Sequence, residues 1–211
     1  MAVPPLSREA VGEQLGVSRE TLDRLAVHVD LLRRWQPAIN LVGPATLADP
    51  WRRHVLDSAQ LAAHLPATAA DLVDLGSGAG FPGMVLALLG RRGVHLVEAD
   101  RRKAQFLREV ARHTGAPVTI HAERIERMAG WPAAVITARA LAPLPRLLEL
   151  AERFLVSDSV CLLLKGRSVE RELTNARVSW HMVSEMFPSL ADPLGSVLTL
   201  RGICRARHRQ S

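Results

Sequence analysis

The chain has 211 residues, a formal net charge of +6 at pH 7 and 48% hydrophobic residues. This length supports one ordinary hydrophobic core with a small extension, and no apolar run is long enough to span a bilayer. The first ten residues, MAVPPLSREA, lack the charged and apolar regions of a signal peptide, so we expect a cytoplasmic protein with no membrane partner.

The first sixty-odd residues predict helices. Ser18 is placed to cap a helix whose apolar stripe contains Leu22, Leu25, Val29 and Leu32, and this helix should end before Pro37. A Thr-x-x-Asp capping box at Thr46 predicts the start of a second helix that runs to about His64. We therefore expect residues 1–66 to form an N-terminal helical extension packed on a main domain of residues 67–211.

The segment LVDLGSGAGFPG, from Leu72 to Gly83, predicts a buried strand that enters a glycine loop and then a helix. Because Gly78, Gly80 and Gly83 also fit the pattern of dinucleotide-binding proteins, the glycines alone leave two nucleotide ligands open. Asp74 lies at the end of the strand, ahead of Gly76. An acidic residue followed by Gly-x-Gly-x-Gly resembles the first motif of S-adenosylmethionine-dependent methyltransferases, which favours that cofactor.

A second apolar strand, VHLVEAD, ends near Glu98, twenty residues after Gly78. A carboxylate at the tip of this strand can accept hydrogen bonds from both hydroxyls of a ribose, which either nucleotide cofactor carries. The alternative is a surface acid that begins the next helix. The strand, loop, helix and strand in succession favour the ribose role.

Strands and helices alternate along the rest of the chain. Strands are expected near Leu72, Leu96, Val118, Val135 and Cys161, with helices such as 101–113 and 145–154 between them. This alternation predicts an α/β fold with a doubly wound, mostly parallel sheet. Two final segments, His181–Met186 and Ser196–Cys204, are predicted to form a hairpin at the end of the sheet.

Basic residues cluster at helix starts, after glycines and at the C-terminus. The clusters are Arg91 with Arg92, then Arg101, Arg102 and Lys103, and then Arg201, Arg205, Arg207 and Arg209. Such clusters favour a polyanionic partner such as RNA. The alternative is an arginine-rich solvated surface.

Cysteine usage gives no sign of a metal centre. Cys161 and Cys204 stand far apart, with neither a metal-ligand spacing nor a disulfide framework, so we expect reduced thiols in the core and no metal site. No apolar seam in the helical region demands a partner subunit, and we expect a monomer.

Several motifs together resemble the RsmG (GidB) family of bacterial methyltransferases over nearly the whole chain. The matching segments are INLVG at Ile39, RHVLDS at Arg53, LVDLGSGAGFPG at Leu72, LVEADRRKAQFL at Leu96, ERIE at Glu123, TARALAPL at Thr137 and LLKGRSVEREL at Leu163. Val42, where the family often has Thr, and Arg102, where it more often has Lys, depart from the pattern. The resemblance implies a Rossmann-like methyltransferase domain, S-adenosylmethionine as cofactor, and methylation of N7 of guanine 527 in 16S rRNA or a small ribosomal subunit.

The resemblance also implies which residues hold the cofactor. Gly76 and Phe81, with Gly78 of the same loop, would line its pocket; Glu98 would hold the ribose, Ile125 and Glu126 would flank the adenine, and Arg139 would complete the site. Considered without the family, Ile125 and Glu126 could instead begin a helix, one in the core and one in solvent. A guanidinium at Arg139 could bind either the cofactor's carboxylate or an RNA phosphate.

RNA contacts are expected at Arg101, Arg102, Lys103 and Lys165. His54 and Asp57 lie one helical turn apart, and we interpret them as a helix-packing hydrogen bond. Because guanine N7 carries a free lone pair at neutral pH, we assign no catalytic acid or base. The alternatives are a methyltransferase for another RNA, an NAD-type oxidoreductase, and a nonenzymatic RNA-binding protein with the same fold.

Overall fold

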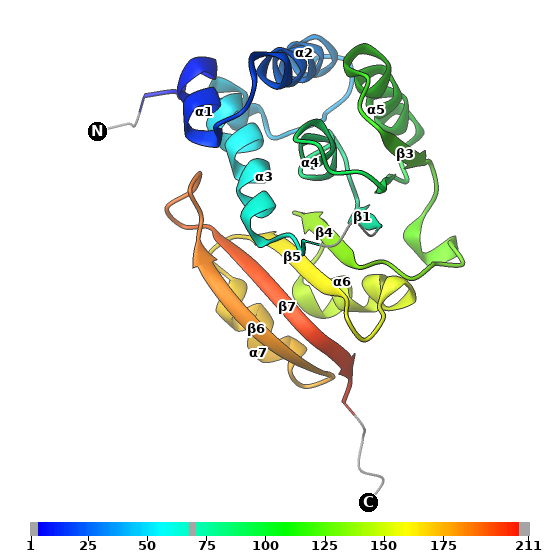
Figure 1. Ribbon diagram of the computed structural model, residues 1–211. Coiled ribbons are helices and arrows are strands. Elements are labelled where there is room, and N and C mark those ends of the chain that lie inside the picture. The colour runs from blue at the N-terminus through cyan, green and yellow to red at the C-terminus, as the bar shows by residue number, and fades with distance from the viewer. Residues whose placement is uncertain (1–3, 68–70, 207–211) are drawn as a thin grey trace, which may run out of the picture.

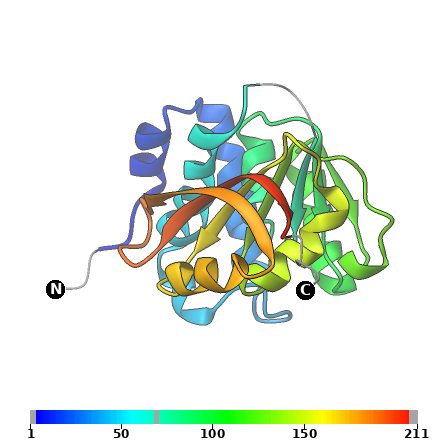
Figure 2. The ribbon, with the colours of Figure 1, turned by 90° about the horizontal axis from the view of Figure 1, so that it is seen from below.

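A computed structural model of the chain describes residues 4–67 and 71–206. Its centre is a seven-stranded sheet in the order β3-β2-β1-β4-β5-β7-β6. Five strands run parallel: β1 (Leu72–Leu75), β2 (Val94–Val97), β3 (Val118–His121), β4 (Val135–Arg139) and β5 (Val160–Lys165). The hairpin of β6 (Trp180–Pro188) and β7 (Ser196–Arg205) pairs antiparallel through β7 to β5 and curves across one end of the sheet in Figure 2. The predicted α/β fold and the terminal hairpin are confirmed.

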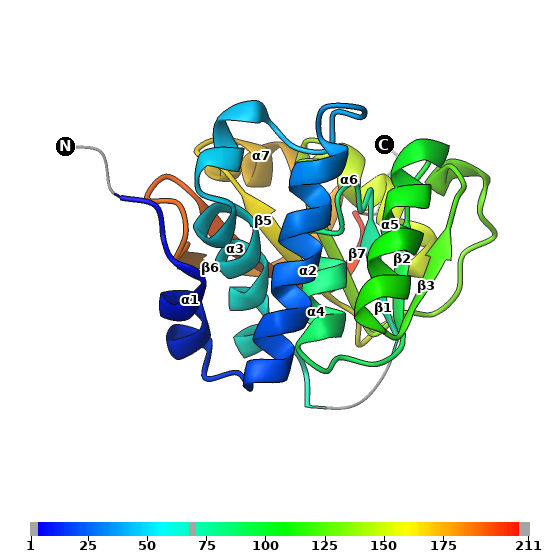
Figure 3. The same ribbon diagram turned by 90° about the horizontal axis from the view of Figure 1, so that it is seen from above.

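Helices cover both faces of the sheet. One face carries α1 (Arg8–Leu15), α2 (Arg19–Trp35), α3 (Asp57–Ala59), α4 (Gly83–Leu88) and α5 (Arg101–Thr114), as Figures 1 and 3 show. The other face carries α6 (Leu144–Ala151) and α7 (Val169–Ala176). Shorter helical turns are η1 (Pro44–Ala48), η2 (Trp51–Leu56), η3 (Gln60–His64), η4 (Ile125–Arg127) and η5 (Glu152–Phe154).

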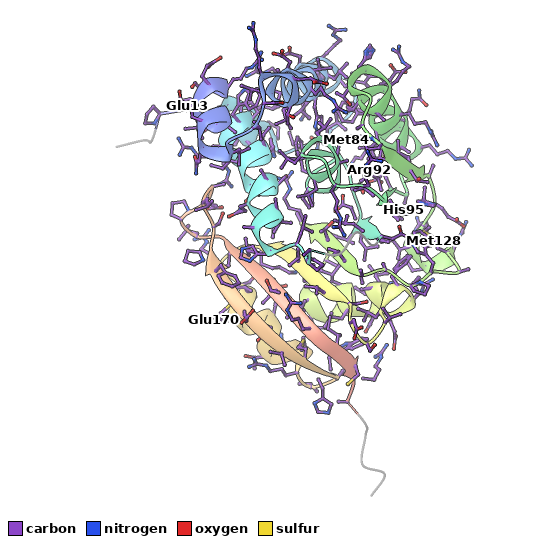
Figure 4. All side chains as sticks on the ribbon, viewed as in Figure 1. Glu13, Met84, Arg92, His95, Met128 and Glu170 are labelled. Atoms are coloured by element: carbon purple, nitrogen blue, oxygen red, sulfur yellow. The ribbon has the colours of Figure 1, made fainter. Side chains whose placement is uncertain are left out.

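Alternate strand residues divide the core into two layers, as the pleat of a sheet requires. On β1, Leu72 faces the N-terminal helices, whereas Val73 and Leu75 face α6 and α7. Figure 4 shows Met84 of α4 in the layer between the N-terminal helices and the sheet, and Glu13 on the outer side of α1. The N-terminal helices share their apolar layer with α4 and α5, so they are part of the same core.

One predicted helix start is confirmed and one predicted capping interaction is wrong. Ser18 caps α2 as predicted, because its hydroxyl accepts from the Thr21 N–H at 3.1 Å. The capping box predicted at Thr46 is wrong. Thr46 lies inside the 3-10 helix η1 and donates to the carbonyl of Gly43, while the Asp49 carboxylate accepts from the Arg52 N–H.

The chain from 51 to 64 is a succession of short helices and begins with a π-helix, η2. It ends at His64, as predicted. The boundary between an extension and a main domain at residues 66 and 67 stays a prediction.

The two cysteines have different environments. Cys161 lies in the core, where burial raises the pKa of its thiol to about 12. Cys204 is exposed on β7, so the prediction of a second core thiol is wrong. The buried part of β7 is a continuous run, residues 197–200, and Cys204 lies beyond it.

Among residues 4–67 and 71–206, no group of three or more His, Cys, Asp or Glu side chains is placed to hold a metal ion. No helix of the same ranges is both long and apolar enough to cross a membrane.

Candidate cofactor and acceptor cleft

The glycine loop follows β1 at the carboxyl edge of the parallel strands, where α/β folds bind ligands. Gly76 has a φ of 66°, and a Cβ there would lie 2.5 Å from Cδ1 of Leu141. A Cβ on Gly83 would lie 2.5 Å from Leu96 and 2.7 Å from Cβ of Asp74. A side chain at Gly83 would therefore push α4 away from the sheet, and one at Gly76 would be strained by the positive φ.

Asp74, at the end of β1, lies buried against the glycine loop. It is 1% exposed, and the Thr137 hydroxyl donates to its Oδ1 at 2.7 Å. Burial raises the pKa of Asp74 to about 6. The Ser77 hydroxyl donates to the Asp74 carbonyl at 2.9 Å, which ties the loop back to its strand.

A cavity of about 370 Å³ lies between the ends of β1, β2 and β4. Its walls bring together five of the residues predicted to hold the cofactor: Gly76, Gly78, Glu98, Ile125 and Glu126. Val97, Leu141 and Leu150 add apolar surface. A planar heterocycle suits such apolar walls, and a carboxylate at the edge suits a sugar.

Two backbone N–H groups hold the carboxylate of Glu98 in place. Its Oε2 accepts from the Gly78 N–H at 2.8 Å and its Oε1 accepts from the Asp100 N–H at 2.7 Å. A carboxylate offers about four acceptor sites, so each oxygen keeps capacity for one more donor. Two vicinal hydroxyls can supply those donors.

Ile125 and Glu126 meet the cavity from the short helix η4. Ile125 is buried, whereas Glu126 is about half exposed and pairs with Arg146 at 3.0 Å. A hydrogen bond from its own backbone N–H is the main cause that lowers the pKa of Glu126. The two residues therefore give the cavity one apolar wall and one polar rim.

A second cavity, of about 760 Å³, adjoins the first and shares Gly76, Gly78, Lys103, Ala140 and Leu141 with it. Phe81, Arg139 and Lys165, all predicted site residues, line this larger space. Parts of its wall also come from residues within 41–57 and 189–196, two segments far apart in the sequence. Ala140 has a φ of 52°, a rare conformation for a residue other than glycine, and it turns the chain where the two cavities meet.

Phe81 is held between two histidines of the N-terminal helices. The His28 ring stacks on it with 4.7 Å between centroids, and the His54 ring stacks with 4.9 Å. His28 Nε2 lies 2.8 Å from the carbonyl of Ala79, so this nitrogen carries the proton and donates. Burial lowers the pKa of His28 to about 4, which keeps the ring neutral.

Arg139 leaves β4 and enters the larger cavity. Its Nη1 lies 3.0 Å from the Arg53 carbonyl, 3.0 Å from His54 Nδ1 and 3.4 Å from Asp57 Oδ2. Burial lowers the pKa of Arg139 and raises the pKa of Asp57, while the attraction between the two opposes both shifts. Burial and the nearby guanidinium lower the pKa of His54 to about 3.

The interpretation of His54 and Asp57 as a mutual helix-packing contact is therefore wrong. Both side chains bond to Arg139 from another part of the chain, and both line the larger cavity. The π-helical geometry of η2 carries them there, and helical spacing alone does not predict it. In the sequence, only the RHVLDS motif of the family resemblance marks His54 and Asp57 as candidate site residues. No local pattern indicates the contact of His28 with Phe81.

The predicted RNA-binding residues have different environments. Arg101 and Arg102 are exposed at the start of α5, where the Asp100 carboxylate caps the helix, and Arg102 also donates to the carbonyl of Ala38. Lys103 lines both cavities. The side chain of Lys165 is only 9% exposed, and its ammonium pairs with Glu172 at 2.8 Å and donates to the Ala142 carbonyl at 3.0 Å.

The C-terminal basic cluster is described only in part. Arg205 of β7 pairs with Glu152 at 2.7 Å and lies over the Trp180 ring. Arg207 and Arg209 lie outside the described residues.

The chain shares its fold with solved structures, among them proteins described with S-adenosylmethionine. A mutant of MtNAS in complex with S-adenosylmethionine superposes with a TM-score of 0.60 at 18% identity, covering 93% of this chain and 84% of that one. A TehB-like S-adenosylmethionine-dependent methyltransferase from Corynebacterium glutamicum has a TM-score of 0.56 at 16% identity, covering 84% and 99%. At these identities the likeness concerns the fold.

Sequence comparison is more specific. The family model described as GidB, rRNA small subunit methyltransferase G, matches residues 21–194. A protein named ribosomal RNA small subunit methyltransferase G from Rhodospirillum centenum is 61% identical, covering 89% of this chain and 87% of that protein. Its namesake from Paramagnetospirillum magneticum is 56% identical, covering 91% and 94%.

The family match excludes the oxidoreductase and nonenzymatic alternatives, because this is a family of S-adenosylmethionine-dependent methyltransferases. The chain belongs to the GidB family and is an S-adenosylmethionine-dependent methyltransferase.

Proposed function

We propose that this enzyme methylates N7 of a guanine in 16S rRNA, guanine 527 by family resemblance, by direct in-line transfer without a general base. The observation that carries the proposal is the pair of adjoining cavities, because one suits a nucleoside and the other is large enough for a second base. The relatives' names supply the class of RNA. We propose that the enzyme acts in the cytoplasm as a monomer on the small subunit or an assembly intermediate.

The residues present fit S-adenosylmethionine. Glu98 would accept from the ribose, and Ile125 and Glu126 would flank the adenine. Gly76, Gly78 and Phe81 would bound the amino-acid part, with Arg139 at its carboxylate. When bound, the cofactor supplies a methyl group activated by a positively charged sulfonium.

The protonation states in the larger cavity agree with chemistry that needs no base. His54 Nδ1 accepts from Arg139, and its Nε2 lies 2.9 Å from the Thr46 hydroxyl, so both ring nitrogens are engaged. Asp57 is paired with Arg139, and Glu172 with Lys165. Guanine N7 carries a lone pair at neutral pH, so no residue has to remove a proton from it. The contribution of the chain is to hold the reactants in line and exclude water.

The acceptor base has to leave its helix to enter the cavity. N7 lies on the major-groove edge, and the major groove of A-form RNA is too narrow for protein side chains. An unpaired or splayed base is therefore required. In this proposal Arg101 and Arg102, which are exposed at the start of α5, contact the flanking phosphates. Lys103 and Lys165, which line the larger cavity, contact groups inside it.

Methylation of isolated subunits tests the proposal. Small ribosomal subunits without the modification are incubated with the enzyme and tritiated S-adenosylmethionine, and N7-methylguanine is mapped by borohydride and aniline cleavage. We expect one new cleavage, at guanine 527. Label at another atom or another nucleotide, with cofactor binding intact, would contradict the assigned position.

The cofactor site has its own test. Glu98→Ala removes both ribose acceptors, so we expect calorimetry to show cofactor affinity falling by about 10- to 100-fold, as for the loss of charged hydrogen bonds. Glu98→Gln, which keeps one carbonyl oxygen, should lose less. Equal affinities for the two variants and the unchanged protein would exclude Glu98 from the ribose site.

A further inference from the structure

The RHVLDS segment, residues 53–58, supplies three acceptors to one nitrogen of Arg139. They are the carbonyl of Arg53, Nδ1 of His54 and Oδ2 of Asp57, and all lie within 3.4 Å of Nη1. The first two belong to the π-helix η2, and Asp57 follows it directly. Single π-helical turns are often found at functional sites. One turn of helix therefore holds one edge of the guanidinium.

The hydrogen bonds around His54 fix its proton on one nitrogen. Arg139 can only donate, so His54 Nδ1 accepts and is unprotonated. Nε2 therefore carries the proton and donates to the Thr46 hydroxyl at 2.9 Å. That hydroxyl in turn donates to the Gly43 carbonyl at 2.7 Å. This chain of donors fixes the ring in one tautomer, with its acceptor facing Arg139.

The other edge of Arg139 faces the ligand space. Its hydrogen bonds to described residues all come from Nη1, and its guanidinium carbon lies 5.0 Å from the centre of the Phe81 ring. The side chain is 18% exposed and lines the larger cavity. Strand β4 pairs with β1, which places Arg139 beside the glycine loop. A recess of this kind suits a small carboxylate better than the backbone of an RNA helix.

We propose that His54 and Asp57 are positioning residues that hold Arg139 by Nη1, so that its remaining N–H donors face the carboxylate of S-adenosylmethionine. The inference rests on the proposed assignment of Arg139 to the cofactor. Neither His54 nor Asp57 touches the reacting atoms. Their effect is to direct a fork of donors whose bidentate geometry matches a carboxylate.

Two ligands separate this role from a purely structural one. S-adenosylmethionine carries the carboxylate, whereas 5′-methylthioadenosine keeps the adenosine and sulfur without it. The dissociation constants of both are measured by calorimetry on the intact protein and on Asp57→Asn. We expect Asp57→Asn to weaken S-adenosylmethionine about tenfold, as for one weakened charged contact, and 5′-methylthioadenosine less than twofold.

Further variants keep the test valid if Asp57→Asn folds poorly. His54→Phe removes the acceptor at Arg139 but keeps a ring on Phe81, so the same selective loss is expected. Asp57→Glu, which restores the charge, should recover part of the affinity. Asp49→Asn, which weakens the Asp49–Arg52 ion pair outside both cavities, is the matched control and should leave both affinities unchanged.

Arg139→Gln tests the assignment of Arg139 to the carboxylate separately from the positioning role of His54 and Asp57. Arg139→Gln should lose S-adenosylmethionine selectively. If it does and the His54 and Asp57 variants do not, the positioning role is refuted while the assignment of Arg139 stands. If Arg139→Gln weakens both ligands equally, the assignment of Arg139 to the carboxylate fails first. Equal losses of both ligands in Asp57→Asn and His54→Phe would reduce their role to holding the fold.

Discussion

His28 makes the stability of this protein depend on pH. The ring is 0% exposed, it stacks on Phe81 beneath the glycine loop, and burial lowers its pKa from 6.5 to about 4. Its Nε2–H donates to the Ala79 carbonyl, and the positive charge of Arg139 further disfavours protonation. The folded protein therefore holds His28 neutral at a pH at which an unfolded chain would protonate it.

The sign and size of the pH effect on stability follow from the ordinary pKa of histidine, 6.5, and the pKa of His28 in the folded protein, about 4. As the pH falls below 6.5, the unfolded state binds the proton first, so stability is lost progressively between about pH 6.5 and 4. Between pH 7.5 and 5.5, the cost from His28 is about 1.3 kcal/mol. Asp74 acts in the opposite direction, because its raised pKa of about 6 lets the folded state take up a proton over part of this range.

A comparison of variants isolates the contribution of His28 from that of Asp74. His28→Gln does not titrate and keeps an N–H donor, so urea unfolding at pH 7.5 and 5.5 should show about 1.3 kcal/mol less acid destabilisation than in the unchanged protein. The variant should be less stable at pH 7.5, because the ring stack is lost. His181→Gln, on the exposed side of β6, is the matched control and should keep the full acid destabilisation. The same pH dependence in His28→Gln as in the unchanged protein would refute this account of the buried ring.

The remaining predictions concern the glycine loop and the basic cluster. Gly83→Ala should lower the free energy of unfolding by about 1–3 kcal/mol, because the new Cβ would overlap Leu96 and Asp74. Gly166→Ala is the control, because Gly166 has open space around it and the free energy of unfolding should change little. Urea unfolding measures both variants. Arg101→Ala with Arg102→Ala should weaken binding to 16S rRNA and reduce the salt slope of log K by about 2, with cofactor affinity unchanged by calorimetry. Lys103→Ala should weaken the cofactor as well, because Lys103 lines both cavities; a cofactor affinity equal to that of the unchanged protein would contradict this.

Local patterns in the sequence were enough to predict the fold, the glycine loop and the carboxylate at the end of the second strand. The glycine loop, the strand ending near Glu98 and the alternation of strands and helices depend on neighbours in the chain. The right-handed winding of parallel strands then brings their carboxyl ends to one edge. For this reason Gly76, Gly78 and Glu98 could be predicted from local patterns, whereas Ile125 and Glu126 were implied by the family resemblance. The structure places all five around one cavity.

Only the tertiary structure decided how the larger cavity is built. Its walls join η1 and η2 to the ends of β4 and β5 and to the loop between β6 and β7, and no local pattern encodes those distances. His54 and Asp57 have helical spacing in the sequence, yet His54 in the π-helix and Asp57 directly after it both bond to Arg139, more than eighty residues away. Lys165 is predicted to contact RNA, and the structure adds a partner that no local pattern indicates, because its ammonium is paired with Glu172 in a mostly buried position. Sequence determines the secondary structure and the ligand loop through short-range geometry, whereas the partners of a buried charge depend on which distant segments pack beside it.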